Sequence, residues 1–296
     1  MNAYVLAAFL ILQNPPATSQ VQKPEEVPPV QKPEQVLQPV ETEHLPSTGR
    51  RIVTNFWSDQ KGIWTSPFRI NRRDAAWWAL FGGGTAALIA TDRRTSKALP
   101  NTVRQVSFSR NVSQIGAVYT TLPVAGALYM YGKKVDDPHM REAGVLGTEA
   151  LLDGFMLETI MKYGAGRERP DLAGGNARFF KGQRSFPSGH ATMSWAFASL
   201  ISHEYKGGKV VPTVAYSLAS IVSVARFTSQ KHFASDIVAG GSMGWFIGKY
   251  VFEKHLDAEI HKRYDSNLRS RLTPEIYPVF DPRSRTYALS LAWDPQ

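Results

Sequence analysis

Cysteine is absent from all 296 residues, which excludes disulfide bonds, a thiolate nucleophile and cysteine-ligated metal ions. The mean hydropathy of −0.24 argues against a chain built mostly of membrane spans. Hydrophobic residues make up 43% and charged residues 20%, which excludes a wholly disordered or collagen-like chain. The length predicts roughly two domains.

Acidic residues are too few to balance the charge of most of the chain. The formal net charge is +9, yet residues 1–49 hold five Glu against two Lys and therefore sum to −3. The rest of the chain carries +12. Such a basic body is typical of proteins with an anionic partner: phosphate, nucleic acid or acidic lipid.

The N-terminus has one short apolar run, residues 3–12, with no Lys or Arg before it. A helix of this length cannot cross a bilayer, but it suits the core of a signal peptide. Ala17 and Ser19 are small enough to mark a cleavage site. We predict a signal peptide or N-terminal anchor over residues 1–19, with an unstructured start as the alternative.

Residues 20–50 are rich in Pro, Gln and Glu and contain a nine-residue repeat that begins at Val21 and again at Val30. Proline removes a backbone donor and fixes φ, which disfavours both helix and central strand. We expect an extended linker without a core of its own.

Six apolar stretches of helical length follow, and strand-like alternation is nearly absent from them. Small residues recur, as at Gly82–Gly84 and at Gly240 and Gly241, and they permit close helix packing. The pattern predicts an all-α bundle of about six core helices. The stretches are residues 74–90, 113–132, 140–163, 189–205, 210–227 and 235–254.

The helical domain is expected over residues 51–255, followed by a polar C-terminal tail over residues 256–296. Within the tail, residues 286–293 alternate weakly between apolar and polar. This segment is either a short strand or a surface-packed tail.

Membrane insertion of the bundle meets an obstacle in the third stretch, which carries Glu149, Asp153 and Glu158. Each carboxylate would cost about 2.5–3.5 kcal/mol at a bilayer centre. Residues 113–132, in contrast, form a long stretch without charge. We expect a water-soluble bundle that associates with a membrane through its N-terminus or an apolar face; an integral membrane protein is the alternative.

Three short segments, residues 162–170, 185–190 and 226–236, combine cations, histidines and turn residues. The first closes the third helix, because Pro170 disfavours helix at the residue before it. The second opens the fourth helix, and the third links the fifth to the sixth. In an up-and-down bundle all three lie at the same end, so we place the active site there.

The cations of these segments are Lys162, Arg169 and Arg226, which would repel one another without an anion among them. Ser188 offers a hydroxyl group, and Gly189 offers a free N–H at a helix N-terminus. Arginine matches phosphate oxygens as a two-pronged donor, and lysine supplies a point charge. The ligand that fits is a tetrahedral oxyanion such as phosphate.

Two histidines and an aspartate complete the set. Asp236 lies four residues after His232, one helical turn away, so its carboxylate can reach the imidazole. A carboxylate on one ring nitrogen leaves the other nitrogen free to attack, and His190 can protonate the leaving oxygen. Each residue alone has an ordinary explanation as a cap, a dipole partner or a surface pair, but together they indicate phosphoryl transfer.

These segments resemble the signature of the type 2 phosphatidic acid phosphatase superfamily: Lys, six residues, Arg-Pro; then Pro-Ser-Gly-His; then Ser-Arg, five residues, His, three residues, Asp. One position departs from the pattern, because Ala225 stands where the pattern has Ser. The matching residues are Lys162, Arg169, Pro170, Pro187, Ser188, Gly189, His190, Arg226, His232 and Asp236.

The resemblance implies an all-α core and metal-independent hydrolysis through a phosphohistidine at His232, oriented by Asp236. It implies that His190 is the general acid and, in the second step, the base that activates water. The residues implied to bind the phosphoryl oxygens are Lys162, Arg169, Ser188, Gly189 and Arg226. Membrane relatives act on lipid phosphates and polyprenyl pyrophosphates. Soluble relatives include bacterial acid phosphatases and vanadium haloperoxidases, in which vanadate occupies the phosphate site.

We therefore predict a phosphatase of phosphomonoesters or pyrophosphates, lipid phosphates included, with a vanadate-dependent haloperoxidase as the alternative. The expected partner is a phosphorylated small molecule or lipid, and a membrane surface is a further candidate. No nucleic acid is expected, since aromatic and basic residues do not interleave. No metal or other cofactor is expected, because the clustered cations disfavour a metal ion; vanadate would bind as a phosphate analogue.

The predicted location is the periplasm or cell envelope, with the inner membrane as the alternative.

Four further cations lie between the third and fourth helices, where they either line the mouth of the site and steer anions or are plain surface charge. They are Arg167, Arg178, Lys181 and Arg184.

Overall fold

The computed structural model describes residues 48–69, 72–100, 102–172, 175–257, 260, 275–281 and 286–292. The chain divides into two compact units. One comprises Pro46–Lys262 and is helical where it is described; the other comprises Met1–Leu45 with Arg263–Gln296. The predicted signal segment, residues 1–19, and all but the last three residues of the predicted linker lie outside the described residues.

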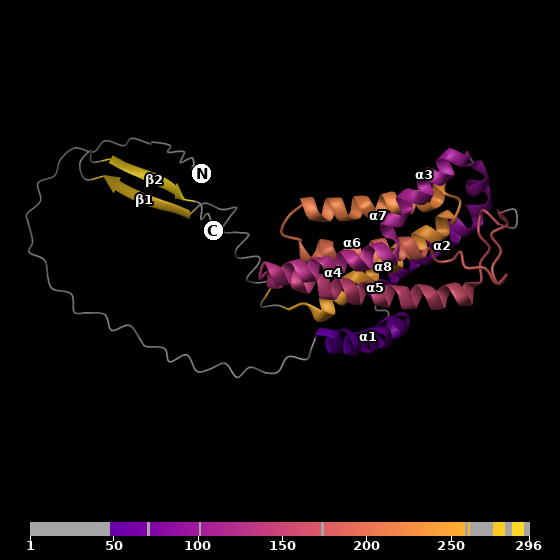
Figure 1. Cartoon of the computed structure of the whole chain (residues 1–296), viewed down its shortest axis with the longest axis horizontal. Helices are drawn as coiled ribbons and strands as arrows, with labels where there is room; N and C mark the ends of the chain where they lie inside the picture. Colours follow the sequence, from indigo (N-terminus) through magenta and orange to yellow (C-terminus); the bar gives the residue numbers. More distant parts are fainter. Residues whose placement is uncertain are drawn as a thin grey trace, which may run out of the picture. The chain divides into compact units, whose positions relative to one another are not determined.

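The helical unit contains all six predicted helices and confirms the all-α fold (Figure 1). The third predicted helix, residues 138–165, starts where the Asp137 side chain accepts a hydrogen bond from the Met140 N–H. It ends at Gly166, whose φ of 52° is left-handed. The six are α2 (Arg72–Ala98), α4 (Val118–Lys134), α5 (Pro138–Ala165), α6 (Gly189–Glu204), α7 (Val210–Thr228) and α8 (Ala234–His255).

Two further helices were not predicted, because neither has a continuous apolar stretch. They are α1 (Thr48–Thr65) and α3 (Val103–Ser113), each followed by a short 3₁₀ turn, η1 (Ser66–Arg69) and η2 (Gln114–Gly116). α1 meets α5 through polar side chains: Asn55 donates to Glu149, and Gln60 donates to Asp153. Its Trp57 is 65% exposed. The apolar residues of α1 recur at helical spacing, as at Ile52, Phe56 and Ile63, but polar residues separate them, so α1 lacks the continuous apolar stretch by which the other helices were predicted.

α8 packs directly on the backbone of α6 through a stripe of glycines. A Cβ built on Gly240 would lie 2.6 Å from the carbonyl oxygen of Ser188. Cβ atoms at Gly244 and Gly248, one and two turns later, would strike backbone oxygens of α6. The contact therefore requires glycine, and it fixes the start of α8 beside the start of α6.

Apolar side chains also cover part of the outside of the unit. Among the described helices, α7 alone has the length and hydropathy of a membrane-crossing segment, and only 28% of that segment is buried. Its Val214, Ile221 and Val224 are exposed. One such helix does not by itself establish a membrane span.

The C-terminal tail contains an antiparallel hairpin of β1 (Glu275–Asp281) and β2 (Thr286–Ala292). In its register Glu275 pairs with Ala292 and Phe280 with Tyr287. The second strand confirms the strand alternative for residues 286–293. The first strand was not predicted, and its Pro278 lowers any expectation of a strand there.

Candidate active site

The three predicted segments meet at one end of the helical unit. The Lys162 ammonium, near the end of α5, lies against the start of α6: a Cβ built on Gly189 would be 2.9 Å from its Nζ. The Ser188 N–H donates to the carbonyl oxygen of Asp236 at 2.9 Å, which joins the start of α6 to the start of α8. Arg226, in the last turn of α7, is close enough to lower the pKa of His190.

His232 is held with one ring nitrogen bound and the other available. Its Nδ1 donates to the carbonyl oxygen of Ser185 at 2.8 Å, so Nε2 carries the lone pair. Burial, above all, lowers the pKa of His232 to about 4, and the nearby cations Arg226 and Lys162 add to this effect. The imidazole is therefore neutral at pH 7, which is the nucleophilic form.

Asp236 approaches His232 but is not its nearest partner, because its Oδ2 lies 3.6 Å from Nδ1. The same oxygen accepts hydrogen bonds from the Ser185 hydroxyl at 2.5 Å and the Phe233 N–H at 2.9 Å. Burial alone would raise the pKa of Asp236, but hydrogen bonds and the charges of His232 and Arg167 outweigh it and lower the pKa. The carboxylate thus faces the imidazole, while the Ser185 carbonyl fixes the tautomer.

His190 lies on the first turn of α6, with its Nε2 3.3 Å from the Oε1 of Gln114 in η2. Burial is the largest cause that lowers its pKa to about 3, followed by repulsion from Arg226, His232, Lys162 and Arg169. Positive charge at this density disfavours an imidazolium. A phosphate dianion among the same groups would reverse the balance and favour the protonated ring.

Arg226 and Lys162 differ in how their charges are balanced among the described residues. Arg226 is buried; its Nη1 donates to the Ser113 hydroxyl at 3.3 Å and its Nε has no partner among the described residues. Burial first, and then the charge of Arg169, lowers the pKa of Arg226 to about 10. Lys162, in contrast, pairs through its Nζ with Glu158 at 2.7 Å.

Ser188 offers a buried hydroxyl group to a ligand. It is fully buried, and its hydroxyl has no hydrogen-bond partner among the described residues. It precedes the N-terminus of α6, where backbone N–H groups are free to bind an anion. An unpaired hydroxyl and an unpaired guanidinium Nε beside clustered cations fit a tetrahedral oxyanion.

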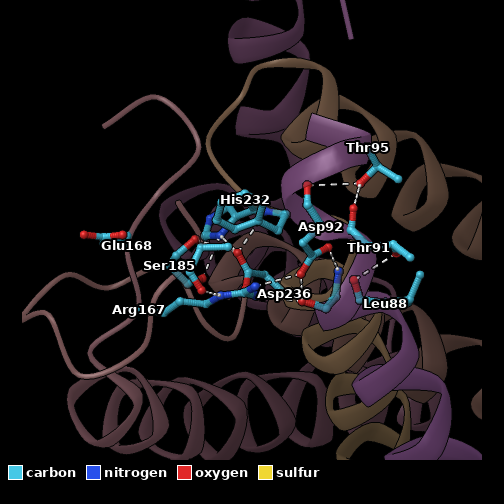
Figure 2. Close-up of polar contacts among 12 residues, drawn as sticks. Leu88, Thr91, Asp92, Thr95, Arg167, Glu168, Ser185, His232 and Asp236 are labelled. Carbon is cyan, nitrogen blue, oxygen red and sulfur yellow. Dashed lines mark hydrogen bonds and ion pairs between the residues drawn. The ribbon is translucent and has the colours of Figure 1, made fainter. Parts of the chain in front are cut away.

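Arg167 corrects one prediction. We expected it at the mouth of the site or on the surface, but its side chain is 0% exposed. Its Nη1 donates to Asp236 at 2.5 Å and its Nη2 to Asp92 at 2.7 Å, between the rings of Phe179 and Phe233 (Figure 2). The next residue, Glu168, points away from Arg167 on the same loop (Figure 2).

The sequence does not predict a role for Asp92 on α2, because an aspartate directly before Arg93 and Arg94 is typical of an exposed charged surface. Arg178 is 57% exposed and pairs with Glu168 at 2.9 Å, which agrees with the surface-charge alternative.

One group of side chains away from this end has the composition of a metal site. Ligand atoms of Asp59, Glu149 and His255 lie within 4.8 Å of one another. Asp59 already accepts hydrogen bonds from Lys254 at 2.7 Å and from the His255 ring at 2.9 Å. The carboxylate of Asp59 is therefore already paired with the Lys254 ammonium.

Comparison with known proteins points to one family. A model of the PAP2 superfamily matches residues 144–259. The chain is 32% identical over 140 residues to a lipid A 1-phosphatase of Porphyromonas gingivalis, an alignment that covers 47% of this chain and 29% of that protein. It is 26% identical over 164 residues to a PA-phosphatase related-family protein of Dictyostelium discoideum, which covers 49% and 59%. The chain thus spans less than two thirds of either relative.

Two solved structures are similar at low identity. A transmembrane PAP2-type phosphatidylglycerolphosphate phosphatase of Bacillus subtilis is 18% identical, with a TM-score of 0.43 over 71% of this chain and 98% of that chain. LpxE of Aquifex aeolicus is 20% identical, with a TM-score of 0.40 over 55% of this chain and 93% of that chain.

The matched segment contains every predicted catalytic and phosphate-binding residue, from Lys162 to Asp236. The similarity to the PAP2 superfamily thus covers residues 144–259 and includes the whole predicted site.

Proposed function

We propose that this protein is a phosphatase that transfers a phosphoryl group to His232 and then to water. The observation that carries the proposal is the orientation of His232: its Nδ1 is bound to the Ser185 carbonyl and its neutral Nε2 is available. Beside it stand the unpaired Ser188 hydroxyl and the buried Arg226.

In the first step, Nε2 of His232 forms a bond to phosphorus while the bond from phosphorus to the leaving oxygen breaks. His190, protonated once phosphate has joined the cations, gives its proton to that oxygen. The phosphorylated ring of His232 is positive, and Asp236 stabilises that charge. The cations and the start of α6 stabilise the charge on the phosphoryl oxygens, usually the largest contribution to catalysis.

In the second step, the now neutral His190 takes a proton from water as the water oxygen bonds to phosphorus. The bond between nitrogen and phosphorus breaks, and its electron pair returns to His232. Phosphate leaves, and both histidines are restored. The sum is ester plus water giving alcohol plus phosphate, with the cations supplying the positive charge that other phosphatases obtain from metal ions.

A phosphate ester with an apolar tail suits the surroundings of the site. A groove of about 930 Å³ runs between α2 and α7 over α6 and α8, lined by aromatic side chains such as Trp77, Trp195 and Trp245. Ile237 lines it too and directly follows Asp236 in the chain. We therefore propose lipid phosphates as substrates and a working location at a membrane of the cell envelope.

The test is phosphate release from a panel of p-nitrophenyl phosphate, phosphatidic acid and a polyprenyl pyrophosphate, together with fractionation of cells. His232→Ala should lower turnover at least about a thousandfold. Inorganic phosphate and vanadate should inhibit competitively, and a chelator should leave activity unchanged. Retained turnover in His232→Ala, or loss of wild-type activity in chelator, would contradict the proposal.

A further inference from the structure

α2 reaches the active end through polar side chains, although it is apolar over much of its length. The buried residues among positions 75–98 of α2 are Thr85, Asp92 and Ser96, and all three are polar. Ser96 donates to the side chain of Gln230 at 3.0 Å, just before His232. Asp92 lies one turn earlier and is 0% exposed.

Asp92 is bound on both oxygens. Its Oδ2 accepts from Nη2 of Arg167 at 2.7 Å and from the Ser235 hydroxyl, and its Oδ1 accepts from the Ser235 N–H at 3.1 Å. Through these bonds α2 is attached both to the loop after α5 and to the first turn of α8 (Figure 2). The Oδ1 of Asp236 accepts a hydrogen bond from Nη1 of the same guanidinium at 2.5 Å.

Asp92, Arg167 and Asp236 therefore form a row of three charges, each fully buried. If Asp236 were the only partner of Arg167, the guanidinium would neutralise the carboxylate that faces His232. Asp92 balances Arg167, so the row keeps one net negative charge. A buried arginine that lost this partner would also carry an uncompensated charge.

We infer that Asp92 is a positioning residue for the reaction at His232, which it influences through Arg167 and Asp236. The inference rests on the proposed function, because it assigns Asp92 a role in forming the phosphohistidine. It also extends the working site to α2, outside residues 144–259.

The effect of Asp92 should be visible in the titration of His232. The charged or titratable groups that face this ring are Asp236 on α8, Arg226 at the end of α7, Lys162 near the end of α5 and His190 on α6. Only Asp236 among them is negative. Weakening its field should make His232 harder to protonate.

The experiment compares the full chain with Asp92→Asn, which keeps the shape of the side chain and removes its charge. We expect kcat for p-nitrophenyl phosphate to fall about tenfold to a hundredfold, with KM nearly unchanged. We also expect the NMR titration of the ¹⁵N-labelled His232 ring to move about one pH unit or more toward acid. A normal kcat together with an unmoved His232 titration would overturn the inference.

Ser96→Ala is the matched control, because it removes a buried polar contact from the same face of α2 without touching Arg167. It should leave kcat and the His232 titration unchanged. The double variant Asp92→Asn with Arg167→Gln should be no slower than Arg167→Gln alone, since Asp92 acts through Arg167. Additive losses would overturn the inference.

Two outcomes separate this inference from the proposed function. If the wild-type chain releases no phosphate, the proposed function fails, while the His232 titration still decides whether Asp92 acts on that ring. If Asp92→Asn does not fold, Ser235→Ala loosens the same row from α8. It should lower kcat several-fold at unchanged KM, and an unchanged kcat would overturn the inference.

Discussion

Gly189 lies so close to Lys162 that no larger residue leaves the lysine where it is. A Cβ at position 189 would stand 2.9 Å from Nζ of Lys162 and 2.8 Å from Oε1 of Glu158. Both atoms are the far ends of flexible side chains, and both can move aside without disturbing a helix. Glycine is thus required at position 189 because a larger residue would displace the Lys162 ammonium, and not because the packing of the helices demands it.

Gly189→Ala should separate activity from stability. The displaced Lys162 ammonium should reduce kcat/KM about tenfold to a hundredfold, since a misplacement of about 1 Å is enough. The free energy of unfolding should change little, because the two atoms that an alanine displaces are the ends of flexible side chains. Steady-state kinetics and urea unfolding would measure the two effects. Gly83→Ala on α2, where a Cβ meets open space, is the control, and equal kinetics in both variants would contradict the argument.

The sequence was sufficient to predict which segments meet at one end of the helical unit but not all of the contacts between them. Lys162, Ser188, His190 and Arg226 are recognisable because short segments fix their chemistry and connectivity brings those segments to one end. The nearest partner of His232, in contrast, is the backbone carbonyl of Ser185. Any residue type offers that atom, so no pattern of side chains reveals it.

The helices likewise divide into those that the sequence predicts and those that it does not. The helices α2 and α4 to α8 follow from apolar stretches of helical length. α1 was missed because polar residues such as Asn55 and Gln60 interrupt its apolar residues, so it forms no such stretch. Asp92 was missed for a related reason: only the packing of α2 beside Arg167 distinguishes it from an exposed charge.

Binding of phosphate should make His190 easier to protonate. In the phosphate-free protein, burial and the surrounding cations hold the pKa of His190 at about 3. An added dianion should raise the pKa of His190 by about one to three pH units. NMR titration of ¹⁵N-labelled histidine rings, with and without inorganic phosphate, measures this change. The ring of His203, bound to the Ser199 carbonyl, should not respond. Phosphate binding without any change at His190 would remove its role as the acid.

Glu149 should make the protein less stable as the pH rises. Burial raises its pKa from 4.5 to about 7, against the opposing charges of His255 and Arg51. Between these values the folded chain keeps a proton that the unfolded chain has lost, so stability falls as the pH rises through this window. The full effect corresponds to roughly 3 kcal/mol by pH 8.

Glu149→Gln should make this slope shallower, because its amide does not titrate and Asn55 can still donate to its oxygen; Asp153, whose pKa burial raises to about 8, keeps its own contribution. Urea unfolding from pH 5 to pH 8 would measure the difference. Glu253→Gln, an exposed change on α8 beside Lys249, should leave the slope as it is in the wild-type chain. A variant that loses stability with pH as steeply as the wild type would show that Glu149 is ionised throughout.

The apolar groove between α2 and α7 should matter for substrates with a lipid tail and not for small ones. Gly84 lines this groove, and a side chain there meets open space, so Gly84→Phe should fill part of the groove without disturbing packing. We expect kcat/KM for phosphatidic acid to fall about tenfold and the value for p-nitrophenyl phosphate to stay the same. Gly82→Phe is the matched control: it adds the same ring to the same helix, also into open space, but away from the groove lining. If both variants lose activity equally, or neither does, the tail of the substrate binds elsewhere. A selective loss in Gly84→Phe would place the tail along α2, the same helix that carries Asp92.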